Sequence, residues 1–258
     1  MKFEPRHAGA FVMILASTVA WAGPPFQTDD PEPVDYKHWE IYVFSEETRS
    51  EVTTDEGVHK RTEGVLPGFE FNYGILPDVQ LSVTAPFEYS RATGEGSQLG
   101  YGDTEIAVKY RFIQEDESGW RPQVSFYPSL ELPTADTAEE EDESHTRTFL
   151  PLWAQKSWGP WTTFGGGGYW INPGAENRDY WFFGWALVRK ITENFSFGGE
   201  IFHQTADTVE STASSGFNLG GIYDFNEKHH LVFSAGRGIG HASGTNKFSY
   251  YVGYEVTF

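Results

Sequence analysis

The chain has 258 residues, a formal net charge of −19, no cysteine and an aromatic content of 17%. The acidic balance excludes nucleic acid as a partner, because a surface that binds nucleic acid is basic. It also argues against electrostatic attachment to an anionic membrane surface. Without cysteine, neither disulfides nor thiol chemistry can contribute. A single β-barrel of this length is common.

The first 22 residues have the features of a secretory signal peptide. Lys2 and Arg6 precede an apolar run over residues 8–20, and Ala20-Trp21-Ala22 has the small-x-small form of a cleavage site. The apolar run is shorter than the roughly 20 residues that a spanning helix needs, which argues against a membrane anchor. We therefore expect export, with cleavage before Gly23.

Residues 23–36 form a second region, which is rich in proline and aspartate. The prolines at positions 24, 25, 31 and 33 lack the N–H group that a β-ladder needs. We expect this region to be an extended periplasmic segment or a partial plug. A barrel over residues 37–258 is expected to follow it.

From Lys37 onward, the alternation of apolar and polar residues predicts twelve β-strands. Short turns and longer polar loops separate these strands alternately. The strands are expected at residues 38–50, 61–75, 79–90, 103–113, 122–132, 148–158, 161–171, 179–190, 195–206, 214–225, 230–239 and 246–258.

The last strand shows the alternation most clearly. Side chains alternate across a strand, so one of its faces is apolar and the other is mostly small or charged. The apolar face consists of Phe248, Tyr250, Val252, Tyr254, Val256 and Phe258. A soluble edge strand of this kind would invite aggregation. In a membrane barrel the same face meets lipid.

These features predict an all-β fold, a transmembrane antiparallel up-and-down β-barrel of twelve strands in the outer membrane of a Gram-negative bacterium. An even number of strands places both termini on the periplasmic side. The expected partners are outer-membrane lipids, lipopolysaccharide and the barrel-assembly machinery, for which Tyr254, Val256 and Phe258 would be the signal. The strand at 179–190 is apolar on both faces, so its orientation stays open.

Charged residues on the inward face are the candidates for lining a pore. In a water-filled lumen they would bias which solutes pass. Alternatively they pair with one another and fill the interior, because eight strands leave no channel and sixteen do. The candidates are Glu70, Glu88, Glu105, Lys109, Arg111, Glu131, Glu200, Lys247 and Glu255. Acids outnumber bases six to three in this set, so an open pore should disfavour anions.

No motif for catalysis, a cofactor or a metal emerges from the sequence. Some outer-membrane barrels hydrolyse lipids with a Ser–His pair, but no Gly-x-Ser-x-Gly signature occurs. The residues available for such a pair are Ser45, Ser90, His203, His241 and Ser243. His229 and His230 are adjacent on a strand and would point to opposite faces. The acidic run 139–143 lacks the spacing of a calcium loop, and Gly165–Gly168 lacks the lysine of a phosphate-binding loop.

Three stretches resemble a known family. They are Pro25–Val34 followed by His38-Trp39-Glu40, Gly102-Asp103-Thr104-Glu105 leading into Lys109–Phe112, and Leu130–Thr134. Together they resemble the phenol meta-pathway-type family of outer-membrane transporter-like proteins (the MetA pathway of phenol degradation). The resemblance implies a barrel over nearly all of the mature chain. It suggests a channel, with hydrophobic or aromatic compounds as candidate cargo, and brings no catalytic residues.

We therefore expect an outer-membrane channel or facilitator for passive uptake of small solutes, without enzymatic activity or a cofactor. Two alternatives stay open. One is a closed structural or surface-binding barrel that uses the loops at 92–100, 134–147 and 207–213. The other is an outer-leaflet lipid hydrolase, which requires a serine and a histidine within hydrogen-bond reach on the outer part of the barrel.

Overall fold

The computed structural model describes residues 25–54, 57–94, 96–116, 119–136, 145–240 and 242–258. The expected signal peptide, the acidic run 139–143 and His241 lie outside the described residues. Among the residues that are described, no helix is long and apolar enough to cross a membrane.

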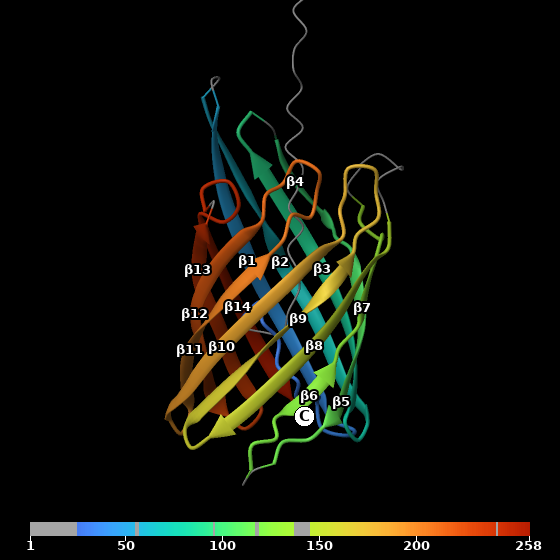
Figure 1. Ribbon diagram of the computed structural model, residues 1–258, viewed down its shortest axis with the longest axis vertical. Coiled ribbons are helices and arrows are strands. Elements are labelled where there is room, and N and C mark those ends of the chain that lie inside the picture. Colours follow the sequence, from blue (N-terminus) through green and yellow to red (C-terminus); the bar gives the residue numbers. More distant parts are fainter. Residues whose placement is uncertain (1–24, 55–56, 95, 117–118, 137–144, 241) are drawn as a thin grey trace, which may run out of the picture.

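The strands form one antiparallel sheet that closes on itself (Figure 1). The strand segments are β1 (Trp39–Thr54), β2 (Gly57–Leu76), β3 (Val79–Ala92), β4 (Ser97–Tyr101), β5 (Thr104–Ile113), β6 (Gln123–Phe126), β7 (Ser129–Leu132), β8 (Arg147–Trp158), β9 (Trp161–Ile171), β10 (Tyr180–Thr192), β11 (Phe195–Gln204), β12 (Ser214–Asn226), β13 (His229–Gly240) and β14 (Phe248–Thr257).

The fourteen segments make the twelve barrel strands that the sequence predicts. β4 and β5 both pair with β3, so they are two halves of one strand, interrupted at Gly102-Asp103. β6 and β7 both pair with β5 and β8, so they are halves of another strand, interrupted at Tyr127-Pro128. Proline has no N–H group to donate to the ladder, which accounts for the second interruption.

The expected loop at 92–100 is wrong for its second half. Residues 97–101 form β4 and pair with β3, with Ser97 opposite Arg91 and Tyr101 opposite Phe87. By its local propensity alone, glycine is disfavoured in β-strands. Here the long neighbouring strand β3 supplies hydrogen-bond partners, which only the assembled sheet reveals.

Strand β14 closes the barrel against β1, as expected. Their paired residues run from Glu40 opposite Thr257 to Arg49 opposite Phe248. At the end of this seam, Trp39 and Phe258 exchange two backbone hydrogen bonds of 2.7 and 3.0 Å. Closure leaves no long open edge in the wall, which protects the sheet from pairing with other chains.

The two ends of the barrel differ. The C-terminus and the short turns at 77–78, 159–160, 193–194 and 227–228 lie at the lower end in Figure 1, and longer connections rise from the upper end. In barrels of this type, short turns face the periplasm and long loops face the outside. The lower end in Figure 1 is therefore the periplasmic end.

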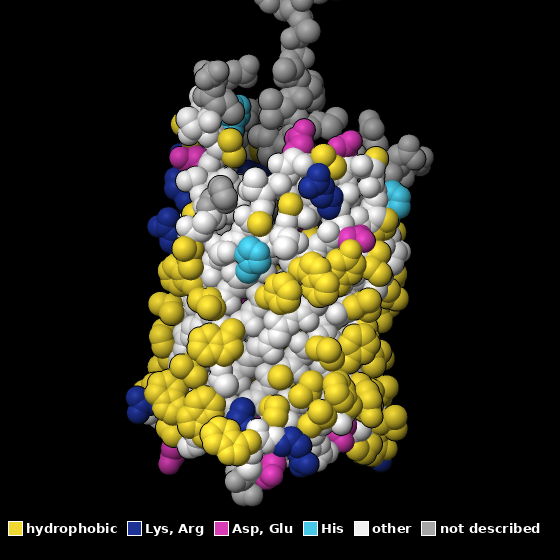
Figure 2. Space-filling model, in the orientation of Figure 1, with side chains coloured by type: hydrophobic (Ala, Val, Ile, Leu, Met, Phe, Trp, Pro, Cys, Tyr) yellow, Lys and Arg dark blue, Asp and Glu magenta, His cyan; other side chains and the backbone are white. Residues whose placement is uncertain are grey.

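The outer wall has the surface that lipid requires. Apolar side chains cover its middle, and charged side chains gather toward the two ends (Figure 2). Near the periplasmic end, aromatic residues contact one another across strands, as Trp39 does with Tyr73 at 4.6 Å between ring centroids. In β14, Tyr254 and Phe258 are exposed while Glu255 is buried, so the alternation has the predicted direction.

Strand β10, whose orientation the sequence leaves open, is apolar toward both lipid and lumen. Trp181, Phe183 and Trp185 are about half exposed on the outer face. Tyr180 and Phe182 are buried on the inner face. Both faces of β10 are apolar because the outer face meets lipid and the inner face packs against aromatic side chains of neighbouring strands.

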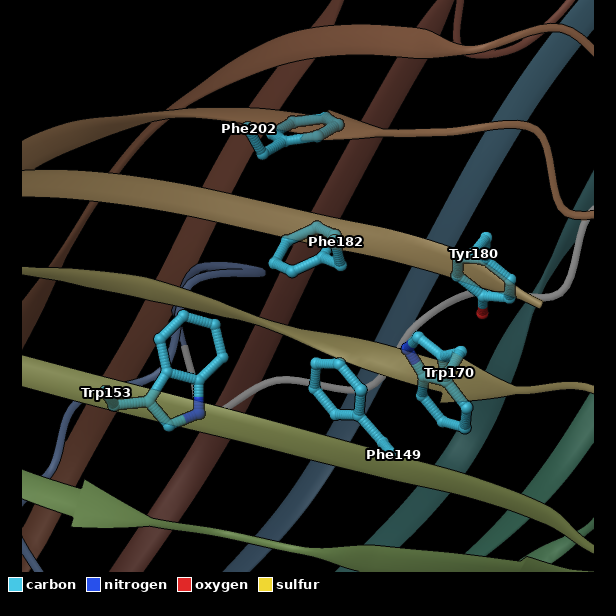
Figure 3. Packing of buried hydrophobic residues seen from close by; sticks show 6 residues of the cluster. All are labelled: Phe149, Trp153, Trp170, Tyr180, Phe182 and Phe202. Atoms are coloured by element: carbon cyan, nitrogen blue, oxygen red, sulfur yellow. The ribbon is translucent and has the colours of Figure 1, made fainter.

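Along β8–β11 the inner face is not mainly charged, because Arg147 and Glu200 point inward there but most of the large side chains are aromatic. Here the lumen holds an aromatic cluster in which each side chain is at most 8% exposed (Figure 3). Its members are Phe149, Trp153, Trp170, Tyr180, Phe182 and Phe202. Phe149 stacks on Trp170 at 4.7 Å between ring centroids. A Cβ atom at Gly168 would lie only 2.6 Å from Cε2 of the Phe149 ring, too close for both to fit. The glycines of β9 thus make room for rings on neighbouring strands, and the rings fill one side of the interior.

Candidate functional site: the N-terminal segment in the barrel lumen

Residues 25–36, called the N-terminal segment below, lie inside the barrel. The segment contacts the inner wall at the middle of the barrel, where the carbonyl oxygen of Pro25 accepts a hydrogen bond from Ser234. It reaches the periplasmic end at Tyr36, which forms a bridge with Gly74 of β2. Its prolines prevent it from joining the sheet, so its backbone polar groups need partners on the wall.

Glu200 of β11 holds the inner end of the segment. Its two carboxylate oxygens accept hydrogen bonds from the backbone N–H groups of Gln27 and Thr28, both at 2.8 Å, and from Thr28 Oγ1 at 2.6 Å. Asn218 Nδ2 of β12 donates a further hydrogen bond of 2.6 Å to the same carboxylate. Glu200 is 3% exposed. This buried carboxylate is fully hydrogen-bonded, as its burial requires.

The shape of the wall also matches the segment at this point. Gly184 of β10 lies directly beneath Thr28, and a Cβ at that position would collide with the Thr28 hydroxyl. Beside it, the ring of Phe26 packs against Phe164 of β9 at 6.3 Å between ring centroids. Gly184 therefore allows the Thr28 side chain to approach the backbone of β10 closely, one of the ordinary uses of glycine in a strand.

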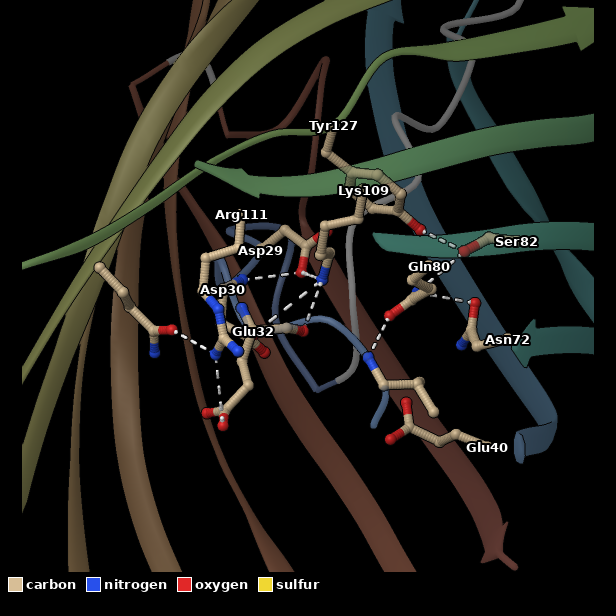
Figure 4. A network of polar contacts seen from close by, with 12 residues as sticks. Asp29, Asp30, Glu32, Glu40, Asn72, Gln80, Ser82, Lys109, Arg111 and Tyr127 are labelled. Atoms are coloured by element: carbon tan, nitrogen blue, oxygen red, sulfur yellow. Dashed lines mark hydrogen bonds and ion pairs between the residues drawn. The ribbon is translucent and has the colours of Figure 1, made fainter. Parts of the chain in front are cut away.

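Lys109 of β5 holds the middle of the segment (Figure 4). Its ammonium lies 3.1 Å from Asp29 Oδ1 and 3.9 Å from Asp30 Oδ1, and 4.6 Å from the ring centroid of Tyr127. Lys109 is 5% exposed and Asp29 is 2% exposed. Burial raises the pKa of the Asp29 carboxyl to about 6, while the charge of Lys109 acts in the opposite direction.

Arg111, two residues further along β5, faces the part of the segment that is nearer the periplasmic end. Asp78 orients its guanidinium with contacts of 2.8 Å to Nε and 2.7 Å to an NH₂ group, and Gln123 accepts a further hydrogen bond of 3.1 Å. Glu32 of the segment is 4.0 Å away. Burial and the neighbouring Asp30 raise the pKa of the Glu32 carboxyl.

A hydrogen-bond network of polar side chains on β2 and β3 also contacts the segment. The backbone N–H of Val34 donates to Gln80 Oε1 at 2.8 Å. The Gln80 amide in turn donates to Asn72 at 3.1 Å and to Ser82 at 2.9 Å, and Tyr127 donates to Ser82 at 2.9 Å (Figure 4). The wall thus offers donors and acceptors at each level that the segment passes.

A cavity of about 50 Å³ lies beside the inner end of the segment. Carboxylates, tyrosines and the segment itself line it, among them Glu46, Glu63, Glu70, Tyr251 and Phe26. The cavity could hold one or two water molecules. The segment therefore lies against the wall on one side and borders this cavity on the other.

The remaining predicted pore residues divide into three groups. Glu70, Glu105 and Glu255 face the interior: Glu70 accepts a hydrogen bond from Asn72 and lines the cavity beside the segment, and Glu105 accepts a hydrogen bond from Ser129. Glu131 pairs with Arg147 and Glu88 lies against Gly102. Lys247 is 52% exposed and pairs with Glu51 at the end of β1, so it does not contact the segment.

Sequence reasoning missed several interior residues. Arg147 was absent from the pore candidates because the strand was expected to start one residue later. Tyr127 shares the alternation of Gln123, Ser125 and Ser129, which are buried on the inner face, but it carries no charge and so was not among the pore candidates. The aromatic cluster gives no local signal of direction, because an aromatic side chain fits a lipid face equally well.

The histidines and serines occupy separate places. His203 Nδ1 lies 2.8 Å from Ser215 Oγ, its partner across β11 and β12. Ser215 is not one of the three serines that the sequence offers for a Ser–His pair. Among the described residues, no further side chain bonds the imidazole. Ser45 contacts Tyr250 at 3.4 Å. His229 contacts Tyr254 and His230 contacts Asp224, and no group of three or more metal-ligating side chains gathers in the described part of the chain.

The fold and the lipid-facing surface define the class: this is a β-barrel of the outer-membrane type. The chain belongs to the family described as "Putative MetA-pathway of phenol degradation", whose model matches residues 42–254. This confirms the resemblance seen in the sequence. No curated protein sequence matches the chain.

Solved structures share the fold at low sequence identity. The COG4313 outer membrane channel from Pseudomonas putida F1 superposes with a TM-score of 0.72 at 14% identity, over 89% of this chain and 98% of that one. The NanC porin gives a TM-score of 0.53 at 10% identity, over 84% and 98% of the two chains. The translocator domain of the autotransporter NalP from Neisseria meningitidis gives 0.51 at 9% identity, over 87% and 89%.

Proposed function

We propose that the protein is an outer-membrane channel for passive uptake of small solutes, and that the N-terminal segment is its gate. The observation that carries the proposal is the position of the segment inside the lumen, bound to the inner wall at several points. It is held by side-chain hydrogen bonds and ion pairs to Glu200, Lys109 and Gln80. It is not a strand of the wall, so it can leave without opening the sheet.

The interior suggests which solutes pass. One side of the lumen is the aromatic cluster of β8–β11, and the opposite side carries carboxylates such as Glu70 and Glu255. A small solute with an apolar body and a polar group fits both sides. The cavity of about 50 Å³ beside the docked segment is small for such a solute. We therefore expect uptake to require movement of the segment.

Planar-bilayer recording tests the gate. We compare the mature chain with a variant that lacks residues 25–34, and expect a larger and longer-lived conductance from the shortened chain. A length-matched control replaces residues 27–32 with glycine and serine, which removes the contacts to Glu200 and Lys109 but keeps the chain length. It should behave like the deletion.

Absence of conductance above background in a correctly folded deletion variant would contradict the proposal. It would favour the alternative of a closed structural or surface-binding barrel, which the packed aromatic cluster also fits. The proposal assigns no catalysis to the protein. The contact between His203 and Ser215 joins residues that face each other across two strands. Within the described part of the chain, no third side chain bonds the imidazole as the orienting group of a hydrolase would.

A further inference from the structure

We propose that Lys109, Arg111 and Tyr127 form a binding site for a small aromatic carboxylate, which the N-terminal segment occupies with Asp29 when the channel is closed. The proposal rests on the gated channel described above. It identifies the ligand that competes with the segment. It also assigns a local anion preference to an interior that is acidic on the whole.

Lys109 requires an anion whenever its surroundings stay dry. Its side chain is 6% exposed and its ammonium is paired with Asp29 at 3.1 Å. A buried cation without a partner is costly, so departure of Asp29 leaves a vacancy that favours another carboxylate. Arg111 lies two positions along the same strand and on the same face. Its guanidinium is already fixed by Asp78 and Gln123.

The segment satisfies this site only in part. Asp29 Oδ2 is buried and has no hydrogen-bond partner among the described residues, and Glu32 stays 4.0 Å from the guanidinium of Arg111. The backbone of the segment fixes where its carboxylates can lie. A free carboxylate has no such restriction and can turn both oxygens toward donors, which carboxylates prefer.

The surroundings point to an aromatic body on the carboxylate. The Tyr127 ring lies 4.6 Å from the Lys109 ammonium and also packs against the aromatic cluster of β8–β11. A flat ring attached to the bound carboxylate would therefore meet aromatic surface directly. The nearby wall carboxylates are engaged elsewhere, Glu40 with the Tyr42 hydroxyl and Glu70 with the Asn72 amide, both at 2.8 Å.

The tether sets the concentration at which a solute competes. A short tethered segment acts as an internal ligand at an effective concentration in the millimolar range. A solute must approach that concentration, or bind more tightly than Asp29, to displace the segment. Weak binding of this kind suits passage, because a solute that binds too tightly does not leave.

Cysteine labelling measures displacement, because the natural chain has no cysteine. Pro31 is buried within the segment between the acidic residues, so Pro31→Cys should react slowly with a maleimide while the segment is docked. We expect sodium benzoate to raise the labelling rate of the folded mature chain at least ~3-fold at roughly 50 mM, well above the effective concentration of the tether. Benzamide, which is neutral and has the same shape, and sodium chloride at equal ionic strength should leave the rate unchanged. Val34→Cys provides a second reporter if the first substitution itself releases the segment.

Variants of the wall locate the site. Lys109→Gln should abolish the dependence of the labelling rate on benzoate, whatever its baseline rate. The control Lys156→Gln removes a cation that pairs with Glu115 away from the segment, and should keep the dependence. Equal acceleration by benzamide or chloride, no acceleration by benzoate, or a benzoate response that survives Lys109→Gln would each overturn the proposal.

The outcome is separable from that of the gate itself. One outcome is that removal of residues 25–34 opens the pore while benzoate changes neither the current nor the labelling rate of the full mature chain. In that case the proposed carboxylate site is contradicted and the proposed gate is retained. If the deletion leaves the barrel without conductance, the proposed function fails first.

Discussion

Glu200 is the residue on which docking of the N-terminal segment depends most. It receives four hydrogen bonds, three of them from Gln27 and Thr28 and one from Asn218. The alternation in β11 places Glu200 inside, so its direction follows from the sequence. Its partners do not, because Thr28 is 172 residues away along the chain. Lys109 shows the same division, since its inward direction follows from alternation and its pairing with Asp29 spans 80 residues.

Substitution of Glu200 tests this dependence. Glu200→Gln keeps the volume but replaces one acceptor oxygen with an NH₂ donor that faces the backbone N–H groups of the segment. Hydrogen bonds to charged groups are worth about 1.5–3 kcal/mol each, so we expect at least ~10-fold faster labelling of a cysteine at position 31. Glu105→Gln is the matched control, because Glu105 is half-buried in the same lumen but bonds Ser129. Equal rates in the two variants would show that Glu200 does not hold the segment.

Among the strands, β10 and β14 show how an element acquires direction. β14 has one charged face, so the sequence orients it without further information. β10 has no charged face. Which of its side chains face inward is set by the aromatic rings of β8, β9 and β11, against which Tyr180 and Phe182 pack inside the lumen. Segments β4, β5, β6 and β7 make a related point. Pro128 accounts for the break between β6 and β7, but only the pairing with shared neighbours shows that β4 and β5, and β6 and β7, are halves of single strands.

The C-terminal strand supports a prediction about assembly. Phe258 contributes the last backbone pair of the β1–β14 seam, with Trp39, and its ring is exposed toward lipid. Deletion of Phe258 should impair membrane insertion, because it removes both this pair and the terminal aromatic residue that we expect the assembly machinery to read. Phe258→Tyr should insert normally. Surface levels of the deletion variant equal to those of the natural chain, measured by heat-modifiable mobility of outer-membrane fractions, would contradict this.

At the scale of the whole molecule, two closed surfaces meet different solvents. The outer wall is apolar over its middle and meets lipid (Figure 2). The inner wall is divided between the aromatic cluster and carboxylates. Twelve strands lie between the eight whose interior side chains fill and the sixteen that leave a channel. The N-terminal segment lies within this lumen and binds its wall.

The outer surface can be tested with a single charge. Trp185, near the middle of β10, is 50% exposed on the lipid side. Trp185→Arg should lower the free energy of unfolding by about 2–4 kcal/mol, the cost of arginine near the bilayer midplane. Trp120→Arg is the control, because Trp120 is 97% exposed in the periplasmic connection between β5 and β6. Urea unfolding in lipid vesicles measures both, and equal effects would mean that Trp185 does not face the hydrocarbon.

The number of strands, the position of most turns, the closing role of β14 and the family all follow from the amino-acid sequence. Alternation, turn residues and the terminal aromatic face are local features, and each acts over a few residues. The aromatic side of the lumen, the continuation of the sheet through β4 and the contacts of the N-terminal segment were decided only by the tertiary structure. The physical reason is the same in each case. These features depend on which side chains share the interior once the sheet has closed, and closure brings together residues far apart in the chain.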